Sequence, residues 1–167
     1  MEVNVKENLK VVEKRIMEAC HRSGRSRDEV TLIAVSKTKP VEMIRECMDA
    51  GITVFGENKA QELRDKQAVI SEPLNWNFIG HLQRNKVKYV VGNVDLIHSV
   101  DSYKLAEAIN EEAEKKNVTA DILIEVNVAG EESKFGVVKE EAEELVRRAA
   151  QLSNIRIKGL MTIAPYV

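Results

Sequence analysis

Short runs of β-branched and apolar residues alternate with segments of helical periodicity along the whole chain. Six such runs predict β-strands: Thr31–Ser36, Ile52–Phe55, Trp76–Ile79, Val94–Ser99, Asp121–Val128 and Ile155–Leu160. Because a helical segment separates each run from the next, consecutive strands are joined by long crossovers. The pattern therefore predicts an α/β fold, with a parallel sheet whose outer face is covered by helices.

The helical segments carry single apolar stripes that we expect to cover the sheet. Two stripes show the spacing of three or four residues: Val5, Leu9, Val12, Ile16 and Ala19 in the first helix, and Ala142, Leu145, Ala149 and Leu152 in the last. Pro40 suits the first turn of a helix that runs to about Ala50, with Gly51 as its left-handed cap. Asp101 is predicted to cap the helix after the fourth strand.

The spacing of the strands favours a barrel. One βα unit takes about 20–30 residues, as in a (β/α)8 TIM-type barrel of roughly 250 residues, and a doubly wound open sheet is the alternative. The sixth strand is followed only by a short segment ending at Val167, and six βα units do not close a barrel. We therefore expect residues 1–167 to form a single, incomplete barrel domain of a longer protein, with open sheet edges available for self-association.

Composition excludes several classes of protein. With 25 Lys+Arg against 27 Asp+Glu, the net charge is −2, which does not favour nucleic acid as a partner. No apolar run approaches the roughly 18–20 residues of a membrane span. The segment Met1–Lys10 lacks the apolar region of a secretory signal, and the spacing of Cys20 and Cys47 suggests neither a disulfide framework nor a metal site. We expect a cytoplasmic protein.

Unusual polar residues collect in the loops that follow the predicted strands. Ligands of parallel α/β folds bind at the carboxyl ends of strands, so these loops predict a binding site. The polar segments are Ser36–Pro40, Gly56–Asn58, Gly80–Lys86, His98–Asp101, Asn127–Gly136 and Met161–Thr162.

Lys37 is the first candidate for chemistry. By strand alternation it shares a face with Ile33 and Val35, and in a covered strand its side chain would lie along apolar walls and present its amine at the mouth of the sheet. Burial lowers the pKa of a lysine, which supplies the neutral amine needed to form a Schiff base with a carbonyl compound. A surface lysine at a strand end is the alternative.

For most of the other loop residues the sequence leaves two interpretations open. Asn58 could bind a ligand or cap the following helix. His81 has no second His or Cys at metal spacing, which favours a hydrogen-bonded loop histidine over a zinc ligand. The basic run Arg84–Lys88 could attract an anion or form the solvated face of a helix. The segment from Gly130 to Gly136 lacks a nucleotide-binding fingerprint.

Six loop strings occur together and in order at the predicted strand ends: Leu32–Pro40, Phe55–Asn58, Trp76–Lys86, Ile97–Asp101, Glu125–Gly136 and Gly159–Thr162. In combination they resemble the pyridoxal-phosphate homeostasis protein family, from the first helix to the last residue. Members of that family resemble the amino-terminal barrel domain of bacterial alanine racemase. The resemblance therefore implies a barrel of this type, with about the first six βα units present.

The resemblance implies that Lys37 carries pyridoxal 5′-phosphate as a Schiff base. It also implies that Asn58 and Met161 line the cofactor ring and that residues around His81 and Ser99 wall the pocket. The implied function is binding and carriage of the cofactor in its intracellular homeostasis, including delivery to apo-enzymes, with no established turnover. The family holds the phosphate and the pyridine nitrogen mainly with loops beyond the sixth strand. Because this chain lacks those loops, we expect a truncated protein.

Three other functions stay open at this stage. A racemase-like enzyme dependent on pyridoxal phosphate needs a second acid–base group, yet Tyr89 and Tyr103 fall in helical segments and Tyr166 lies near the end of the chain. A cofactor-free aldolase would use Lys158, which alternation turns away from the barrel centre. A scaffold acting through its open sheet edges is the third alternative.

Overall fold

The computed structural model describes residues 4–132 and 134–166. Helices and strands alternate through these residues, and three short 3₁₀ helices (η) stand between them. In chain order the elements are α1 (Val5–Ser23), η1 (Arg27–Glu29), β1 (Ala34–Val35), α2 (Val41–Asp49), β2 (Val54–Glu57), α3 (Ala60–Val69), β3 (Asn75–Phe78), η2 (Arg84–Lys86), α4 (Val87–Val90), β4 (Leu96–Val100), α5 (Tyr103–Lys115), β5 (Ala120–Asn127), β6 (Val137–Val138), η3 (Lys139–Glu141), α6 (Ala142–Ala149) and β7 (Ile155–Met161).

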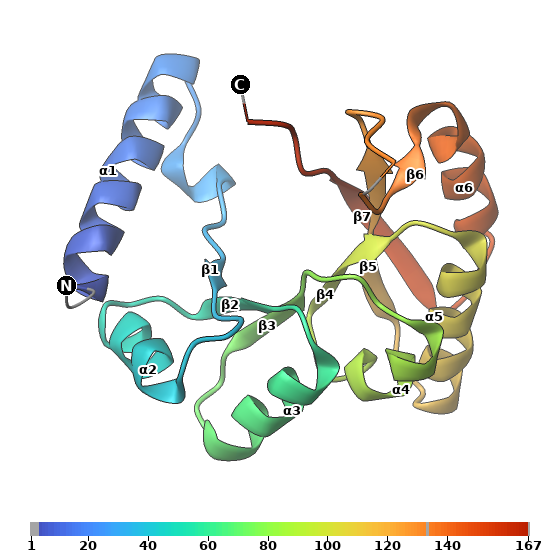
Figure 1. Cartoon of the computed structure of the whole chain (residues 1–167), viewed down its shortest axis with the longest axis horizontal. Helices are drawn as coiled ribbons and strands as arrows, with labels where there is room; N and C mark the ends of the chain where they lie inside the picture. The colour runs from blue at the N-terminus through green and yellow to red at the C-terminus, as the bar shows by residue number, and fades with distance from the viewer. Residues whose placement is uncertain (1–3, 133, 167) are drawn as a thin grey trace.

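The sheet winds in one direction only. Strands β1 to β5 lie side by side in chain order, β7 follows on β5, and all pairs are parallel. A doubly wound sheet reverses its strand order at a switch point, and this sheet does not. The ribbon forms an open horseshoe, with α1 and the C-terminal segment on the two sides of its opening (Figure 1). The predicted α/β fold with a partial barrel is confirmed.

The six predicted strands are present as β1 to β5 and β7, one strand is added, and the first is much shorter than predicted. The addition is β6, which pairs with Val126 and Asn127 at the carboxyl end of β5. Two residues carry no readable periodicity, so the sequence did not predict this strand. The first strand, predicted over residues 31–36, is limited to Ala34 and Val35, and Val35 is 50% exposed.

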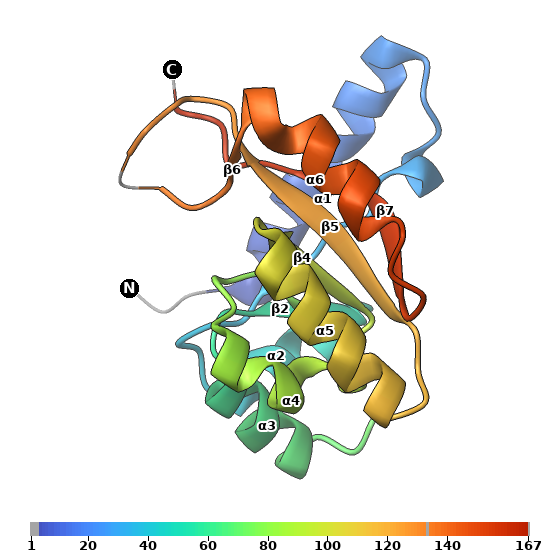
Figure 2. The same ribbon diagram turned by 90° about the vertical axis from the view of Figure 1, so that its right-hand side faces the viewer.

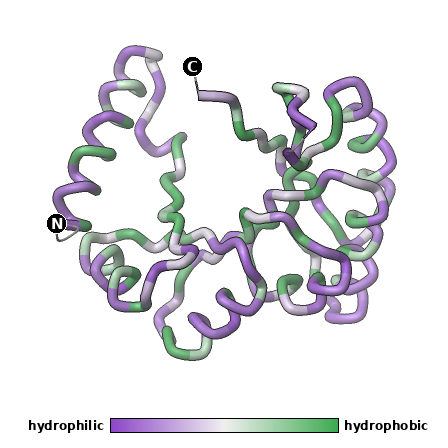
Figure 3. The backbone as a smooth tube through the Cα atoms, viewed as in Figure 1, coloured by the Kyte–Doolittle hydropathy of each residue, from purple (hydrophilic) through white to green (hydrophobic). Residues whose placement is uncertain are grey.

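The apolar core lies between the outer face of the sheet and the helices. Helices α5 and α6 lie against β5 and β7 (Figure 2). Hydrophobic residues concentrate along the strands, whereas the helices carry both hydrophobic and hydrophilic residues (Figure 3). On β3 the alternation turns Trp76 and Phe78 outward into this core and leaves Asn77 on the inner face. The other large core residues include Ile44, Phe55, Leu63, Ile97, Ile109, Ile122 and Ile124.

The predicted helix stripes are covered to different extents. In α6, Leu145 and Ala149 are buried against the core, as expected. In α1 the expectation is wrong in part, because Val12 is 39% exposed and Ala19 is also exposed. Helix α1 packs on α2 and η1 rather than on the sheet, so its stripe meets too little surface to be fully covered.

The helix boundaries confirm one predicted cap and correct another. Helix α2 starts directly after Pro40 and is followed by Gly51 with φ of +93°, as the sequence predicts. The cap of α5 is Ser102, whose hydroxyl accepts a hydrogen bond from the Leu105 N–H at 3.2 Å. Asp101 instead accepts a hydrogen bond from the Gly136 N–H at 3.2 Å. The carboxylate therefore ties the loop after β5 to the end of β4.

Candidate functional site

A cleft of about 700 Å³ opens at the carboxyl ends of the strands and brings several predicted loops together. Lys37, Asn58 and His81 all line it, from the loops after β1, β2 and β3 respectively. Glu125 of β5 and Phe135 of the following loop complete that part of the wall. Its size is typical of a site for a small organic molecule.

Lys37 lies in a tight turn rather than at the end of a buried strand. The Lys39 N–H donates to the Ser36 carbonyl at 3.1 Å, and Thr38 adopts a positive φ of 61° in the third position of the turn. Val35 and Lys37 line the same cleft, as alternation predicted. The predicted burial of Lys37 is wrong: its side chain is exposed, because β1 is a two-residue edge strand with a neighbour on one side only.

Asn58 does not cap the helix that follows it. The N-cap position of α3 is Lys59, and no side chain caps this helix. The Asn58 backbone instead packs tightly against Gly80 after β3, where an added Cβ would lie 2.6 Å from the Asn58 carbonyl oxygen. The close approach of these two loops keeps Asn58 at the cleft. The prediction that Asn58 caps the helix is therefore excluded, and a role in ligand binding stays open.

His81 is held by an aromatic contact. Its imidazole stacks on the Phe135 ring, with centroids 3.9 Å apart and planes inclined by 7°. Such a stack joins the loop after β3 to the loop after β5. Among the described residues no group of three His, Cys, Asp or Glu side chains is arranged to hold a metal ion.

Ser99 is buried and Met161 is half-buried, and neither is among the described residues that line the cleft. Ser99 is 1% exposed and its hydroxyl has no hydrogen-bond partner among the described residues. It lies where the pairing of β4 with β5 shifts in register. Met161 is the β7 partner of Glu125, which does line the cleft.

Glu125 is a cleft residue that the sequence analysis did not single out. It is 7% exposed, and burial raises the pKa of its carboxyl, with a further contribution from the negative charge of Asp101. The signal was present in β5, where a carboxylate alternates with the apolar Ile124 and Val126. Alternation alone would have placed it on the inner face of the sheet.

A second polar pair lies on the inner face, deeper than the cleft. His98 Nε2 is 2.9 Å from Asn77 Oδ1, and the Asn77 amide nitrogen donates to the Phe55 carbonyl at 3.4 Å. Burial lowers the pKa of His98 below its ordinary value. This pair links β2, β3 and β4 below the cleft.

The residues considered for the alternative enzyme functions lie outside the cleft. Tyr89, Tyr103 and Tyr166 are not among the described residues that line the cleft. Lys158 is exposed on β7 and does not line it either. No helix among the described residues combines the length and the apolar character needed to cross a lipid bilayer.

The sequence profile described as "Alanine racemase, N-terminal domain" matches residues 5–167. The chain belongs to this family. The resemblance inferred from the six loop strings is confirmed by relatives within it. The pyridoxal phosphate homeostasis protein of Aquifex aeolicus is 47% identical over 99% of the chain and 73% of its own length. The Escherichia coli protein of the same name is 40% identical over 96% of the chain and 70% of its own length.

Solved structures share the fold. An unknown protein from Bifidobacterium adolescentis superposes with a TM-score of 0.89 at 34% identity, covering 98% of this chain and 70% of its own. PipY of Synechococcus elongatus with PLP bound has a TM-score of 0.80 at 35% identity, covering 97% and 71%. An alanine racemase of Clostridium difficile shares the fold alone. It is 17% identical, with a TM-score of 0.77, and the match covers 97% of this chain and 41% of the racemase chain.

Proposed function

We propose that this chain binds pyridoxal 5′-phosphate in the cleft, holds it as a Schiff base on Lys37, and takes part in homeostasis of the cofactor as a carrier. The observation that carries the proposal is the convergence of Lys37, Asn58 and His81 on one cleft. The relatives support it, since those named above are pyridoxal phosphate homeostasis proteins and PipY has a structure with PLP bound.

The side chains of the cleft fit the chemical groups of this cofactor. When bound, pyridoxal phosphate supplies an aldehyde, with which a lysine amine condenses with loss of one water. Lys37 offers the amine, and the Asn58 amide offers both a donor and an acceptor to polar ring substituents. Lys59 and Lys86 also line the cleft, and their ammonium groups attract a phosphate dianion. We also propose that Met161, the β7 partner of Glu125, lines the cofactor ring and that Ser99 belongs to the wall of the pocket.

Carriage is the function we favour because the relatives named above are pyridoxal phosphate homeostasis proteins. Because the Lys37 side chain is open to solvent, water and a receiving amine both reach its nitrogen, so capture of an aldehyde there is reversible. A racemase-like enzyme needs a second acid–base group of matched pKa on the other face of its substrate. The three tyrosines considered from the sequence are not among the described residues that line the cleft.

Absorbance spectroscopy with chemical trapping tests the proposed function. Pyridoxal phosphate is added to the chain, the near-visible absorbance is recorded, and borohydride reduction is followed by peptide mass mapping. We expect a Schiff-base band and a reduced adduct on the peptide containing Lys37. Lys37→Ala should lose both, whereas Lys39→Ala, at the exposed end of the same turn, should keep them. An adduct spread over surface lysines, unchanged in Lys37→Ala, would refute the proposal.

We further propose that the cofactor passes from the open cleft to apo-enzymes in the cytoplasm. We expect the loaded chain to activate an apo-enzyme faster than the same concentration of chain whose Lys37 adduct has been reduced with borohydride.

The outer edges of β1 and β7 pair with no other strand among the described residues. We propose these edges as the route for any self-association, which sedimentation at rising concentration measures.

A further inference from the structure

Two side chains of α3 hold the backbone on both sides of Lys37. The Lys66 ammonium donates to the carbonyl of Ser36 at 2.6 Å, just before Lys37. The Glu62 carboxylate accepts the N–H of Thr38 at 2.6 Å, just after Lys37. Lys66 and Glu62 also pair with each other at 2.7 Å. A single ion pair therefore contacts the chain immediately before and immediately after the candidate lysine.

A third group anchors this ion pair to the sheet. Glu57, at the end of β2, accepts from the Lys66 ammonium and from the Ser36 hydroxyl, each at 2.6 Å. Its side chain is fully buried and that of Lys66 is 7% exposed. A buried ammonium is tolerated only when its hydrogen bonds are satisfied, and Lys66 has three acceptors. The arrangement is therefore fixed in place rather than one of many surface conformations.

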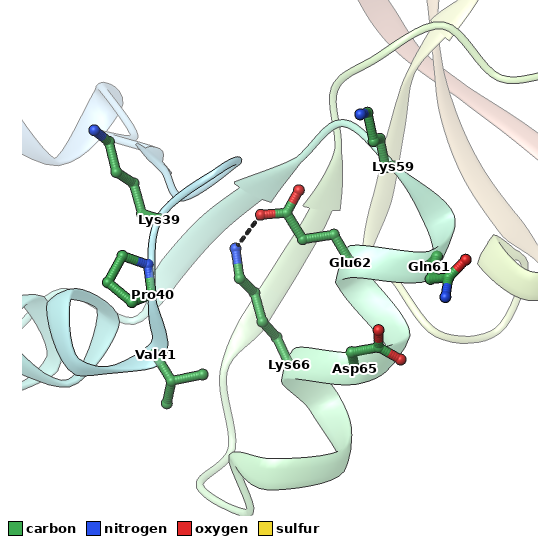
Figure 4. A pocket seen from close by; sticks show the side chains of 8 residues that line it. All are labelled: Lys39, Pro40, Val41, Lys59, Gln61, Glu62, Asp65 and Lys66. Atoms are coloured by element: carbon green, nitrogen blue, oxygen red, sulfur yellow. Dashed lines mark hydrogen bonds and ion pairs between the residues drawn. The ribbon is translucent and has the colours of Figure 1, made fainter.

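The pair lies on the other side of the turn from the binding cleft. Figure 4 shows Lys66 and Glu62 meeting over the groove between α2 and α3, with Lys39 and Pro40 across from them. Lys37 is not part of this groove and lines the cleft at the carboxyl ends of the strands instead. Lys66 and Glu62 consequently act on the backbone of the turn without approaching the cleft themselves.

The turn needs such support. Thr38 has a φ of +61°, a left-handed conformation that a β-branched residue rarely adopts. Strained residues of this kind persist where the surroundings determine them. The Glu62 carboxylate fixes the Thr38 N–H, and the hydrogen bond from Lys39 to Ser36 closes the turn. Without Glu62, the Thr38 N–H loses its acceptor, and the hydrogen bonds that remain on the turn all hold Ser36 rather than Thr38.

We propose that Lys66 and Glu62 are positioning residues for Lys37: they lock Ser36 to Thr38 in one turn and so present the Lys37 amine to the cleft. This inference rests on the proposed function, since it assigns Lys37 as the nitrogen that captures the aldehyde. Holding a reacting group in one orientation raises its rate because less freedom is lost during the reaction. The two residues act through the backbone and do not contact the cofactor.

Glu62 provides the sharper variants. Removing Lys66 leaves the fully buried Glu57 without its cation, so that variant can fail to fold. Glu62→Ala removes the acceptor of the Thr38 N–H, whereas Glu62→Gln keeps an oxygen there without the charge. Glu112→Ala is the matched control, because Glu112 of α5 forms an i,i+4 pair with Lys116, the C-cap of that helix, and its side chain is 19% exposed, against 23% for Glu62.

The first measurement is the rate of borohydride-trapped adduct formation on Lys37 with pyridoxal phosphate. We expect Glu62→Ala to react about tenfold more slowly, as displacement of a reacting group predicts. Glu62→Gln should stay within about threefold of the parent chain, since an amide oxygen still accepts a hydrogen bond, and Glu112→Ala should match the parent. Equal rates for Glu62→Ala and the parent would overturn the inference. Equal losses in Ala and Gln variants would also overturn it, because only the charge would then matter.

The second measurement is hydrogen exchange of the Thr38 amide in the chain without cofactor. We expect exchange about 10- to 100-fold faster in Glu62→Ala, from the loss of a hydrogen bond to a charged acceptor, and near-parent exchange in Glu62→Gln. If the parent chain forms no adduct on Lys37, the proposed function fails, and this measurement alone decides the inference. Unchanged exchange at Thr38 in Glu62→Ala would then refute it.

Discussion

The imidazole of His81 stacks on the phenyl ring of Phe135, with ring centroids 3.9 Å apart and planes 7° from parallel. His81 follows β3, and Phe135 belongs to the loop between β5 and β6. The contact therefore joins two loops at the carboxyl end of the sheet and forms part of the wall of the cleft that holds Lys37. Most of the Phe135 ring surface is otherwise free, since this residue is 55% exposed.

Phe135→Ala should weaken binding of pyridoxal phosphate without unfolding the protein. The stack orders His81 in the cleft wall and is worth about 0.5–1.5 kcal/mol. If binding has to restore that order, its loss weakens the affinity by roughly 2- to 10-fold, and the free energy of unfolding falls by no more than the energy of the stack. An absorbance titration measures the affinity. Val138→Ala removes a residue that is 46% exposed and outside the cleft, and serves as the control. An unchanged affinity in Phe135→Ala would show that the stack takes no part in binding.

Gly80→Ala should disturb the cleft at Asn58. The added Cβ would lie 2.6 Å from the Asn58 carbonyl oxygen and 2.8 Å from its Cα, so backbone has to move. Overpacking of this kind costs about 1–3 kcal/mol, which urea unfolding measures. In Gly56→Ala the Cβ meets only the side chains of Ile79 and Ile33, at 3.0–3.2 Å. These can shift, so we expect a smaller loss, and equal losses in the two variants would contradict the explanation.

His98 should make the fold less stable in acid. Burial lowers the pKa of His98 below 6.5, so the unfolded chain takes up the proton more readily than the folded one. Stability from this group is present above about pH 6.5 and is lost as the pH falls toward the lowered pKa. Urea midpoints measured from pH 7.5 to 5 should fall more steeply in the parent chain than in His98→Gln. Parallel curves would contradict the assignment.

Glu125 should have the opposite dependence on pH. Burial and the nearby Asp101 raise the pKa of its carboxyl above 4.5, so the folded chain binds the proton more tightly than the unfolded one. Its ionised form therefore opposes folding above the raised pKa, and the protein recovers this stability as the pH falls toward 4.5. Glu125→Gln should be more stable than the parent at pH 7.5, with a smaller difference at pH 5. If Glu125→Gln is instead less stable than the parent chain at pH 7.5, the Glu125 carboxylate has a favourable partner in the folded chain, and the prediction is wrong.

The order of strands and helices was readable from the sequence because it depends on local periodicity. The apolar runs alternate with amphipathic segments, and the six long enough to be recognised became β1 to β5 and β7. The candidate lysine was also found locally, as the polar residue at the end of an apolar run. Family membership followed from loop strings such as Trp76–Lys86, which are contiguous in the chain.

Exposure at the site was decided by tertiary structure, because it depends on neighbours that are remote in sequence. Lys37 was expected in a buried strand, but β1 lies at the sheet edge and ends at Val35, which leaves the lysine open to solvent. Asp101 was expected to cap α5, yet the Gly136 N–H lies within its reach and Ser102 takes the cap.

The sequence by itself determined which segments become strands and helices, which loops meet at the carboxyl ends of the strands, and which lysine lies among them. The tertiary structure decided the unreversed strand order, the stack of His81 on Phe135, and the ion pair of Lys66 with Glu62 that holds the turn. The physical reason is that periodicity acts over a few residues, whereas burial, stacking and ion pairing depend on side chains brought together only when the sheet forms.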